Sequence, residues 1–294
     1  MKQSVISIIS PAGGVGKSTI SKELACIFGA TRIDGKPLSV CLVDGNLMFG
    51  CQRALFRVSY TQHDLGTWLS DHRKLLGTMD YGAIEELYTW SYMEKYISRI
   101  SEHNVYLITA PEKCRGGLDM TSSEANTLIR TLRRLFDIII IDTANDLSSL
   151  TVSAIELSSK VFFVINDDQR SLTKMLALRQ TLIRQKMIDN VSGKAEIIFN
   201  KYSKDRHQRF ADPSTVEDIL QFPVVSVIPY FADTIYYNNR CKSLALSNTS
   251  LSDPLLELAR HIIPEVNTSS MRAPLIVRIF AKNRKNSGSS KLRD

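Results

Sequence analysis

The chain has little glycine, proline or cysteine for its length, and no long apolar run. Its 294 residues include 14 glycines, 9 prolines and 5 cysteines, which excludes a low-complexity or fibrous protein. The cysteines are odd in number and form no CxxC pair, which favours reduced thiols over a disulfide framework. No apolar stretch approaches the ~18 residues that span a bilayer, and no signal-peptide pattern opens the chain. These absences predict an intracellular globular protein without a transmembrane segment.

Most of the chain also lacks an excess of charge of either sign. The formal net charge is +7, but residues 271–294 hold seven basic residues against one acid, Asp294. Residues 1–270 hold the other 30 basic residues against 29 acids, so the body is nearly neutral. The length fits one large α/β domain. We expect residues 1–266 to form this domain and residues 267–294 to form a basic, partly amphipathic tail.

Apolar runs alternate with helix-like segments along the body. Continuous runs such as IIII at 138–141 suit strands that are buried on both faces. Strands are expected at 4–10, 39–44, 105–110, 137–142, 160–166, 196–201 and 224–229. Helices are expected at 18–29, 81–99, 121–136, 147–157, 171–188, 213–220 and 254–263. The alternation predicts an α/β fold, a doubly wound and mostly parallel β-sheet with helices on both faces.

A glycine-rich segment, SPAGGVGKST at 10–19, follows the first expected strand and opens the first expected helix. Glycines let backbone N–H groups surround phosphate oxygens, and the helix N-terminus adds the positive end of its dipole. We expect Lys17 to reach the β- and γ-phosphates and the Ser18 hydroxyl to ligate Mg²⁺. The residues predicted to bind the phosphates are Gly13, Gly14, Val15, Gly16, Lys17, Ser18 and Thr19.

The strict GxxxxGK[ST] pattern is not met, because Pro11 occupies the first glycine position. GGVGKST instead resembles the deviant phosphate loop of the MinD/ParA superfamily of dimerising ATPases. Further similar segments follow in that family's order, namely VCLVDGNLMFG (40–50), DIIIIDTAND (137–146), IIFNKY (197–202) and VSVIPYF (225–231). The resemblance covers about residues 15–230. It implies a P-loop ATPase fold, a homodimer, and ATP and Mg²⁺ as cofactors.

The resemblance also implies a role for one residue in each segment. Asp44 is implied to lie near Mg²⁺ and the attacking water, as a catalytic residue together with Lys17. Asp142 corresponds to the Mg²⁺-associated aspartate of the Walker B strand, and Asn200 and Pro229 lie on the side of the base. Both aspartates end apolar strands, where a doubly wound sheet places its ligand crevice. The expected metal ligands are Ser18, Asp44 and Asp142.

Two positions depart from the family pattern. Ala12 stands where the family carries the signature lysine that crosses the dimer interface toward the partner's ATP. Asn46 stands where the second-strand motif usually has a second aspartate. Losing one electrostatic group from a phosphoryl-transfer site commonly costs about 10²-fold in rate. We therefore expect a weak ATP hydrolase, and whether its dimerisation depends on ATP stays open.

Two short segments are similar to the CpaE/TadZ branch, which is associated with localising pilus and secretion machinery. These are LMFG at 47–50 and VYLITAPE at 105–112. They imply a localisation or assembly factor for an envelope machine such as a pilus or secretion system, with a protein partner there. Two alternatives stay open: a plasmid- or chromosome-partitioning ATPase that binds DNA nonspecifically, and a nucleotide-bound scaffold that does not hydrolyse ATP.

The tail segment 273–286, APLIVRIFAKNRKN, is basic and amphipathic if it is helical. Its two faces would carry Leu275, Ile276, Ile279 and Phe280 on one side, and Arg278, Lys282 and Lys285 on the other. Such a segment suits an anionic membrane surface. Docking to protein is the main alternative, and nucleic acid has only charge in its favour. We expect a cytoplasmic protein, with peripheral binding at the inner face of the cell membrane as one hypothesis.

Overall fold

The computed structural model describes residues 3–60, 63–112, 119–203, 205 and 209–266. The predicted tail, residues 267–294, therefore lies outside the described residues. The strands of the main sheet are β1 (Ser4–Ile9), β4 (Val40–Gly45), β5 (Ser98–Ile100), β6 (Val105–Ile108), β7 (Ile138–Thr143), β8 (Lys160–Asn166), β9 (Ala195–Tyr202) and β10 (Val224–Pro229). A separate two-stranded sheet contains β2 (Arg32–Ile33) and β3 (Lys36–Pro37).

Helices connect these strands along most of the chain. They are α1 (Lys17–Ala30), α2 (Gln52–Leu55), α3 (Leu65–Leu76), α4 (Tyr81–Leu87), α5 (Trp90–Met93), α6 (Ser122–Leu135), α7 (Ser149–Leu157), α8 (Gln169–Arg184), α9 (Ile188–Val191), α10 (Pro213–Leu220), α11 (Thr234–Asn239) and α12 (Ser252–Ile262). The described residues also form the short 3₁₀ helices η1 (Glu94–Tyr96) and η3 (Ala245–Ser247).

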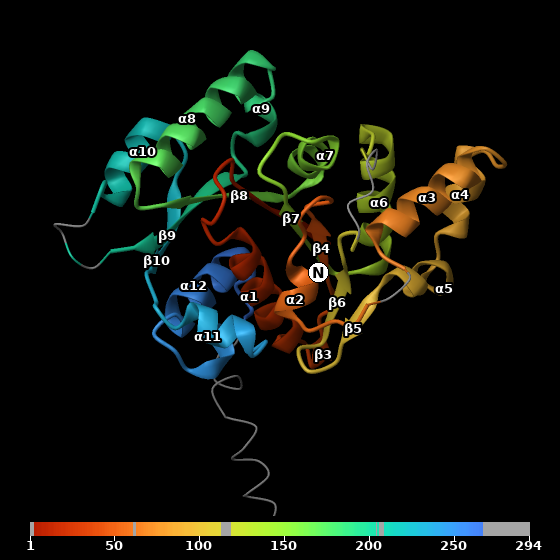
Figure 1. Cartoon of the computed structure of the whole chain (residues 1–294), viewed down its shortest axis with the longest axis horizontal. Helices are drawn as coiled ribbons and strands as arrows, with labels where there is room; N and C mark the ends of the chain where they lie inside the picture. Colours follow the sequence, from red (N-terminus) through yellow and green to blue (C-terminus); the bar gives the residue numbers. More distant parts are fainter. Residues whose placement is uncertain (1–2, 61–62, 113–118, 204, 206–208, 267–294) are drawn as a thin grey trace, which may run out of the picture.

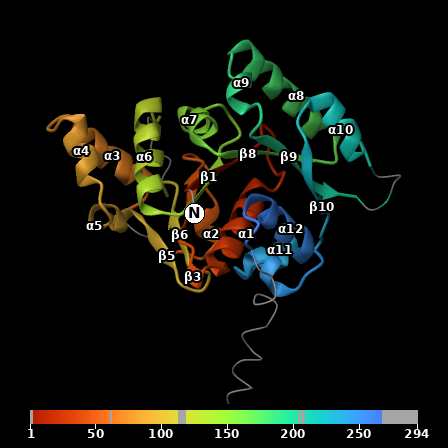
Figure 2. The ribbon, with the colours of Figure 1, turned by 180° about the vertical axis from the view of Figure 1, so that it is seen from behind.

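The main sheet has eight strands in the order β10-β9-β8-β1-β7-β4-β6-β5. Neighbouring strands are parallel except for the edge pair β5 and β6. Figures 1 and 2 show α1, α11 and α12 on one side of the sheet and α6, α7, α8 and α10 on the other. The predicted doubly wound, mostly parallel α/β fold is therefore confirmed.

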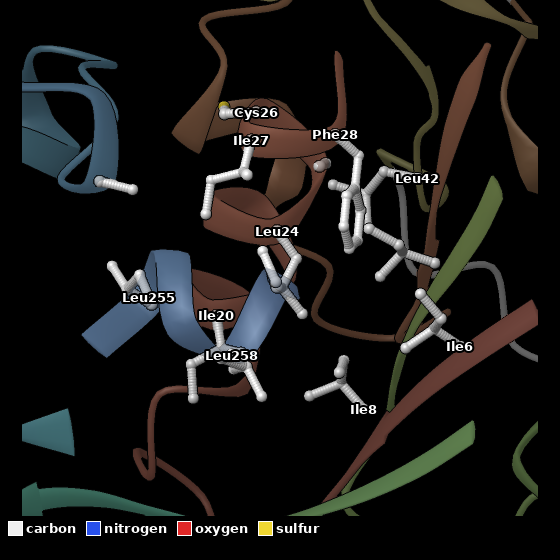
Figure 3. Close-up of a cluster of buried hydrophobic side chains, with 14 of the residues drawn as sticks. Ile6, Ile8, Ile20, Leu24, Cys26, Ile27, Phe28, Leu42, Leu255 and Leu258 are labelled. Atoms are coloured by element: carbon white, nitrogen blue, oxygen red, sulfur yellow. The ribbon is translucent and has the colours of Figure 1, made fainter. Parts of the chain in front are cut away.

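Alternate residues of the central strands supply separate cores on the two faces. Ile138 and Ile140 of β7 join the cluster around α1 and α12, whereas Ile139 and Ile141 join the cluster around α3 and α6. Figure 3 shows the first cluster, in which Phe28 of α1 lies with apolar side chains of the sheet. Burial of each such side chain contributes about 1.5–3 kcal/mol of hydrophobic free energy. These two layers fix the strand ends that carry the site.

The prediction of one helix over 81–99 is wrong. The structure divides this stretch into α4, α5, η1 and the edge strand β5. Asp80 caps α4 by accepting a hydrogen bond from the Ala83 backbone N–H. Helix α4 ends at Leu87, and the side chain of the next residue, Tyr88, is buried against the ring of His72. The apolar residues of this stretch therefore serve a local aromatic core and an edge strand, and not one helical face.

Helix α3 is not among the elements predicted above. A capping box starts it: the Asp64 side chain accepts from the Thr67 N–H, and the Thr67 hydroxyl accepts from the Asp64 N–H. Its apolar face carries the fully buried Trp68.

The described residues contain no helix of the length and apolarity that crossing a membrane requires. Within the same residues, Cys26, Cys41, Cys51 and Cys241 are free thiols. Of these only Cys51 is partly exposed.

Candidate functional site

The glycine-rich loop lies between β1 and α1, where the backbone must turn sharply. Gly14 and Gly16 have φ angles of 75° and 100°, which favour glycine over other residues. Gly16 is the N-cap of α1, and the Asn200 side-chain amide occupies the space that a Cβ at this position would need. The Asn200 amide donates a hydrogen bond to the Val15 carbonyl (2.7 Å). Asn200 of β9 thus holds the backbone of the loop next to the N-terminus of α1.

A cavity of about 550 Å³ opens over this loop. Its walls come from the loop, α1, the carboxyl ends of β4, β9 and β10, and the segment around α11 and α12. The sequence-predicted residues that line it are Gly14, Val15, Gly16, Lys17, Ser18, Thr19, Asp44, Asn200 and Pro229. Gly13 and Asp142 are not among the lining residues. Gly13 is exposed at the edge of the loop, and Asp142 is buried.

Asp44 and Asp142 occupy paired positions in the register of β4 and β7. Both are almost fully buried, and each has one carboxylate oxygen, Oδ1, without a hydrogen-bond partner. Burial, with the nearby Asp142 charge, raises the pKa of Asp44 to about 7. Burial likewise raises the pKa of Asp142 above its usual range. Two buried carboxylates with spare oxygens are a fitting site for a cation such as Mg²⁺.

Gln52, at the start of α2, joins the two carboxylates. Its backbone N–H donates to Asp44 Oδ2 (2.8 Å), and its side-chain amide donates to Asp142 Oδ2 (2.8 Å). The same amide nitrogen donates to the Ser18 carbonyl (2.9 Å) in the first turn of α1. Gln52 is fully buried. Sequence reasoning missed it, because a single glutamine eight positions after an aspartate belongs to no local pattern.

Lys17 extends from the first turn of α1 and is 8% exposed. Its ammonium group hydrogen-bonds to Asn145 Oδ1 and donates to the Ser10 carbonyl (3.5 Å). Burial lowers the pKa of Lys17, and the charge of Asp142 opposes this effect. A partly desolvated ammonium held by neutral oxygens is a strong partner for phosphate. Asn145, which follows β7, is a second residue that sequence reasoning missed.

The far wall of the cavity is apolar and aromatic. Ile228, Pro229 and Phe231 line it beside Asn200. Asn238 of α11 donates a hydrogen bond to the Thr19 hydroxyl (3.3 Å), which ties this wall to the first turn of α1. An apolar wall with a few convergent amides suits a flat heterocycle.

The two departures from the family pattern have clear places in the structure. Ala12 is 4% exposed and belongs to the core cluster around α1. Asn46 closes a turn with Phe49: its amide donates to the Phe49 carbonyl (3.1 Å), and its Oδ1 accepts from the Phe49 N–H (3.1 Å). Neither position therefore presents a charge to the cavity.

Among the described residues, no group of three or more His, Cys, Asp or Glu side chains could hold a metal ion by itself. Mg²⁺ commonly keeps water and phosphate oxygens beside only one or two carboxylates. The pair Asp44 and Asp142, with the hydroxyl of Ser18, is therefore compatible with Mg²⁺ that arrives with a nucleotide.

Residues 3–192 match the family model described as an AAA domain. The chain therefore belongs to this family and, with its fold, to the MinD/ParA superfamily of P-loop ATPases. A search of curated proteins found no match.

Several solved structures share the fold at low sequence identity. The septum site-determining protein MinD from Pyrococcus horikoshii OT3, complexed with Mg-ADP, is 18% identical with a TM-score of 0.69, and the match covers 93% of this chain and 100% of that chain. A ParA family ATPase from Chlorobium tepidum TLS is 19% identical with a TM-score of 0.67, over 88% and 99% of the two chains. A putative plasmid partition protein from Borrelia burgdorferi B31, bound to AMPPNP, is 18% identical with a TM-score of 0.61, over 90% and 100%.

Proposed function

We propose that this protein binds Mg-ATP in the cavity over the glycine-rich loop, hydrolyses it slowly, and uses the nucleotide state to control the assembly or location of an envelope machine. The observation that carries the first part is the pair of buried carboxylates with unpartnered oxygens beside the N-terminus of α1. Solved structures of the same fold hold Mg-ADP and AMPPNP. The cofactors proposed here are accordingly ATP and Mg²⁺.

Each side chain of the site has a role in this proposal. The loop N–H groups and Lys17 would bind the phosphates, and the Ser18 hydroxyl with Asp44 and Asp142 would hold the magnesium ion. Asp44 orients the attacking water. Asn200 and Pro229 contact the base. Bound Mg²⁺ would neutralise charge that develops on the transferred phosphoryl group.

Slow hydrolysis follows from the two missing charges. The Asn46 side chain is engaged in the turn with Phe49, so no second carboxylate faces the attacking water. Ala12 packs in the core, so no amine extends from this position toward a second subunit. Removing one electrostatic group from such a site costs about 10²-fold or more in rate.

Steady-state ATP hydrolysis by the full chain tests this proposal. We expect slow turnover in the wild type and a faster rate in Asn46→Asp, which restores the carboxylate of the family motif. Asn46→Ala is the control, because it also removes the amide donor to the Phe49 carbonyl but adds no charge. If the wild type already hydrolyses ATP fast and Asn46→Asp does not change the rate, then Asn46 does not limit hydrolysis and the proposal of slow turnover is wrong.

The biological role is proposed on the sequence resemblance to the CpaE/TadZ branch. The LMFG segment forms the turn beside the cavity and exposes 75% of Phe49, which lines the cavity mouth. A protein contact at this turn would be close enough to the nucleotide to depend on it. We propose a homodimer with a partner in a pilus or secretion system.

Partitioning of DNA is the rival role, since a putative plasmid partition protein shares the fold. Co-sedimentation with anionic lipid vesicles, with and without residues 271–294, separates the two. Lipid binding that needs the tail supports an envelope role. ATP-dependent DNA binding that survives removal of the tail supports partitioning.

A further inference from the structure

Asn145 lies between the nucleotide cavity and a second hollow, and its side chain touches the glycine-rich loop. It is exposed, in the segment that follows Asp142 at the end of β7. Its Oδ1 accepts the hydrogen bond from the Lys17 ammonium. Its Nδ2 lies 3.5 Å from the position that a Cβ on Gly13 would take. One end of the amide therefore contacts the loop lysine, and the other end lies over Gly13 at the outer edge of the loop.

We infer that Asn145 binds the γ-phosphate and so distinguishes a nucleoside triphosphate from a diphosphate. Its amide would supply, within the same subunit, a hydrogen-bond donor that the side chain of Ala12 lacks. The inference rests on the proposed nucleotide binding. The lysine of a phosphate loop binds the β- and γ-phosphates. Asn145 accepts a hydrogen bond from the Lys17 ammonium, so its side chain lies beside the expected position of these phosphates. The Asn145 amide then has one end on Lys17 and two N–H donors beside a terminal phosphate.

The charges around Asn145 suit this role. A carboxylate at this position would repel the terminal phosphate, and an apolar residue would leave the Lys17 ammonium without its acceptor. A neutral amide satisfies a cation and an anion together, through its oxygen and its nitrogen. A nucleoside diphosphate has no γ-phosphate, so a hydrogen bond from Asn145 would add little to its binding affinity.

The second hollow gives Asn145 an alternative role. This hollow, about 340 Å³, lies beside α8, and Asn145 shares its lining with Pro11, Leu147, Lys174 and Thr181. If Asn145 served only this hollow, its replacement would leave the preference between nucleotides unchanged. The Lys17 contact favours the nucleotide side, because Lys17 lines the nucleotide cavity and not the hollow.

The test is a comparison of affinities for AMPPNP and ADP, each with Mg²⁺, by calorimetric titration of the full chain. The variants are Asn145→Ala, which removes both ends of the amide, and Asn145→Asp, which keeps an acceptor for Lys17 but replaces the donor with a charge that repels the terminal phosphate. We expect both to lower the ratio of AMPPNP affinity to ADP affinity by about 10-fold or more, the usual effect of losing a hydrogen bond to a charged group.

Thr181→Ala is the matched control, because Thr181 lines the second hollow but not the nucleotide cavity. It should leave the affinity ratio at the wild-type value. An unchanged ratio in both Asn145 variants, with ADP affinity retained, overturns the inference and leaves the proposed function standing. A wild type that binds neither nucleotide overturns the proposed function, and the inference falls with it.

Discussion

Gln52 and Asp142 are joined by a buried hydrogen bond of 2.8 Å, donated by the glutamine amide to the carboxylate. The same glutamine donates from its backbone to Asp44. One residue of α2 therefore fixes the orientation of both carboxylates, which come from different strands. The free oxygen of each carboxylate is left for a cation.

Replacing Gln52 should loosen this arrangement. Gln52→Ala removes the buried donor to Asp142 and to the Ser18 carbonyl, so we expect the free energy of unfolding to fall by about 1–3 kcal/mol. The dependence of nucleotide affinity on Mg²⁺ should weaken as well, since Asp142 loses its orientation. Urea unfolding and nucleotide titrations with Mg²⁺ or EDTA measure the two effects. A variant with wild-type stability and wild-type Mg²⁺ dependence would show that Gln52 has no such role.

The stability of the nucleotide-free protein should depend on pH through Asp44. Its pKa is raised from 3.8 to about 7 by burial and by Asp142, so between these values the folded state binds a proton that the unfolded state does not. Stability from this group is complete at low pH and is lost as pH rises through about 7. Asp44→Asn stays neutral and should gain stability relative to wild type over this window, by up to about 4 kcal/mol.

Urea unfolding with EDTA between pH 4.5 and 8 measures this difference. The charge of Asp142 contributes to the raised pKa of Asp44 beside burial, and Asp142→Asn controls for that share of the effect. A constant difference between wild type and Asp44→Asn across the whole range would mean that Asp44 has an ordinary pKa.

Gly16 should tolerate no side chain. Gly16→Ala meets both a φ angle of 100° and the Asn200 amide, so we expect lost nucleotide binding and a stability loss above the ~1–2 kcal/mol of backbone strain alone. Gly193→Ala is the control, because its φ is 80° and no atom lies within 4 Å of the added Cβ. If the two variants lose equal stability and both bind nucleotide, the close contact with Asn200 is unimportant.

The two tryptophans offer a matched pair for the aromatic core of α3. Trp68 is 1% exposed and stacks on His72 with ring centroids 5.1 Å apart, whereas Trp90 is 39% exposed. Trp68→Ala should lower the free energy of unfolding by about 3–5 kcal/mol. Trp90→Ala should lower the free energy of unfolding by clearly less, because part of the Trp90 ring already contacts water. Chemical denaturation of both variants compares them, and equal losses would contradict the assignment of Trp68 to the core.

Where strands are buried on both faces, the sequence alone locates them well. The prediction for 160–166 has both bounds correct, because a short, continuous apolar run is typical of a buried strand. The prediction for 224–229 also has both bounds correct, although β10 is an edge strand and most of its residues are half-buried. The prediction for 81–99 fails, because its aromatic residues pack on α3 through tertiary contacts that no local period reveals. The short hairpin of β2 and β3 also has no apolar signal, since it lies at the surface.

The residues of the candidate site likewise include some that the sequence predicts and some that it does not. Motif and position identify the phosphate loop and the two strand-end aspartates, and the structure brings them together at the carboxyl ends of the central strands. They do not identify Gln52 and Asn145, since each acts through a contact across 90 or more positions of the chain, to Asp142 and to Lys17. Such contacts depend on the register of the sheet and leave no trace in nearby sequence.

Titration of the full-length protein with Mg²⁺ and AMPPNP, with Lys17→Ala measured beside it, tests whether the cavity over the glycine-rich loop binds Mg-ATP. We expect one nucleotide bound per chain, weaker binding in EDTA, and loss of binding in Lys17→Ala. Binding that is indifferent to both Mg²⁺ and Lys17, or no binding by the wild type, would contradict this expectation.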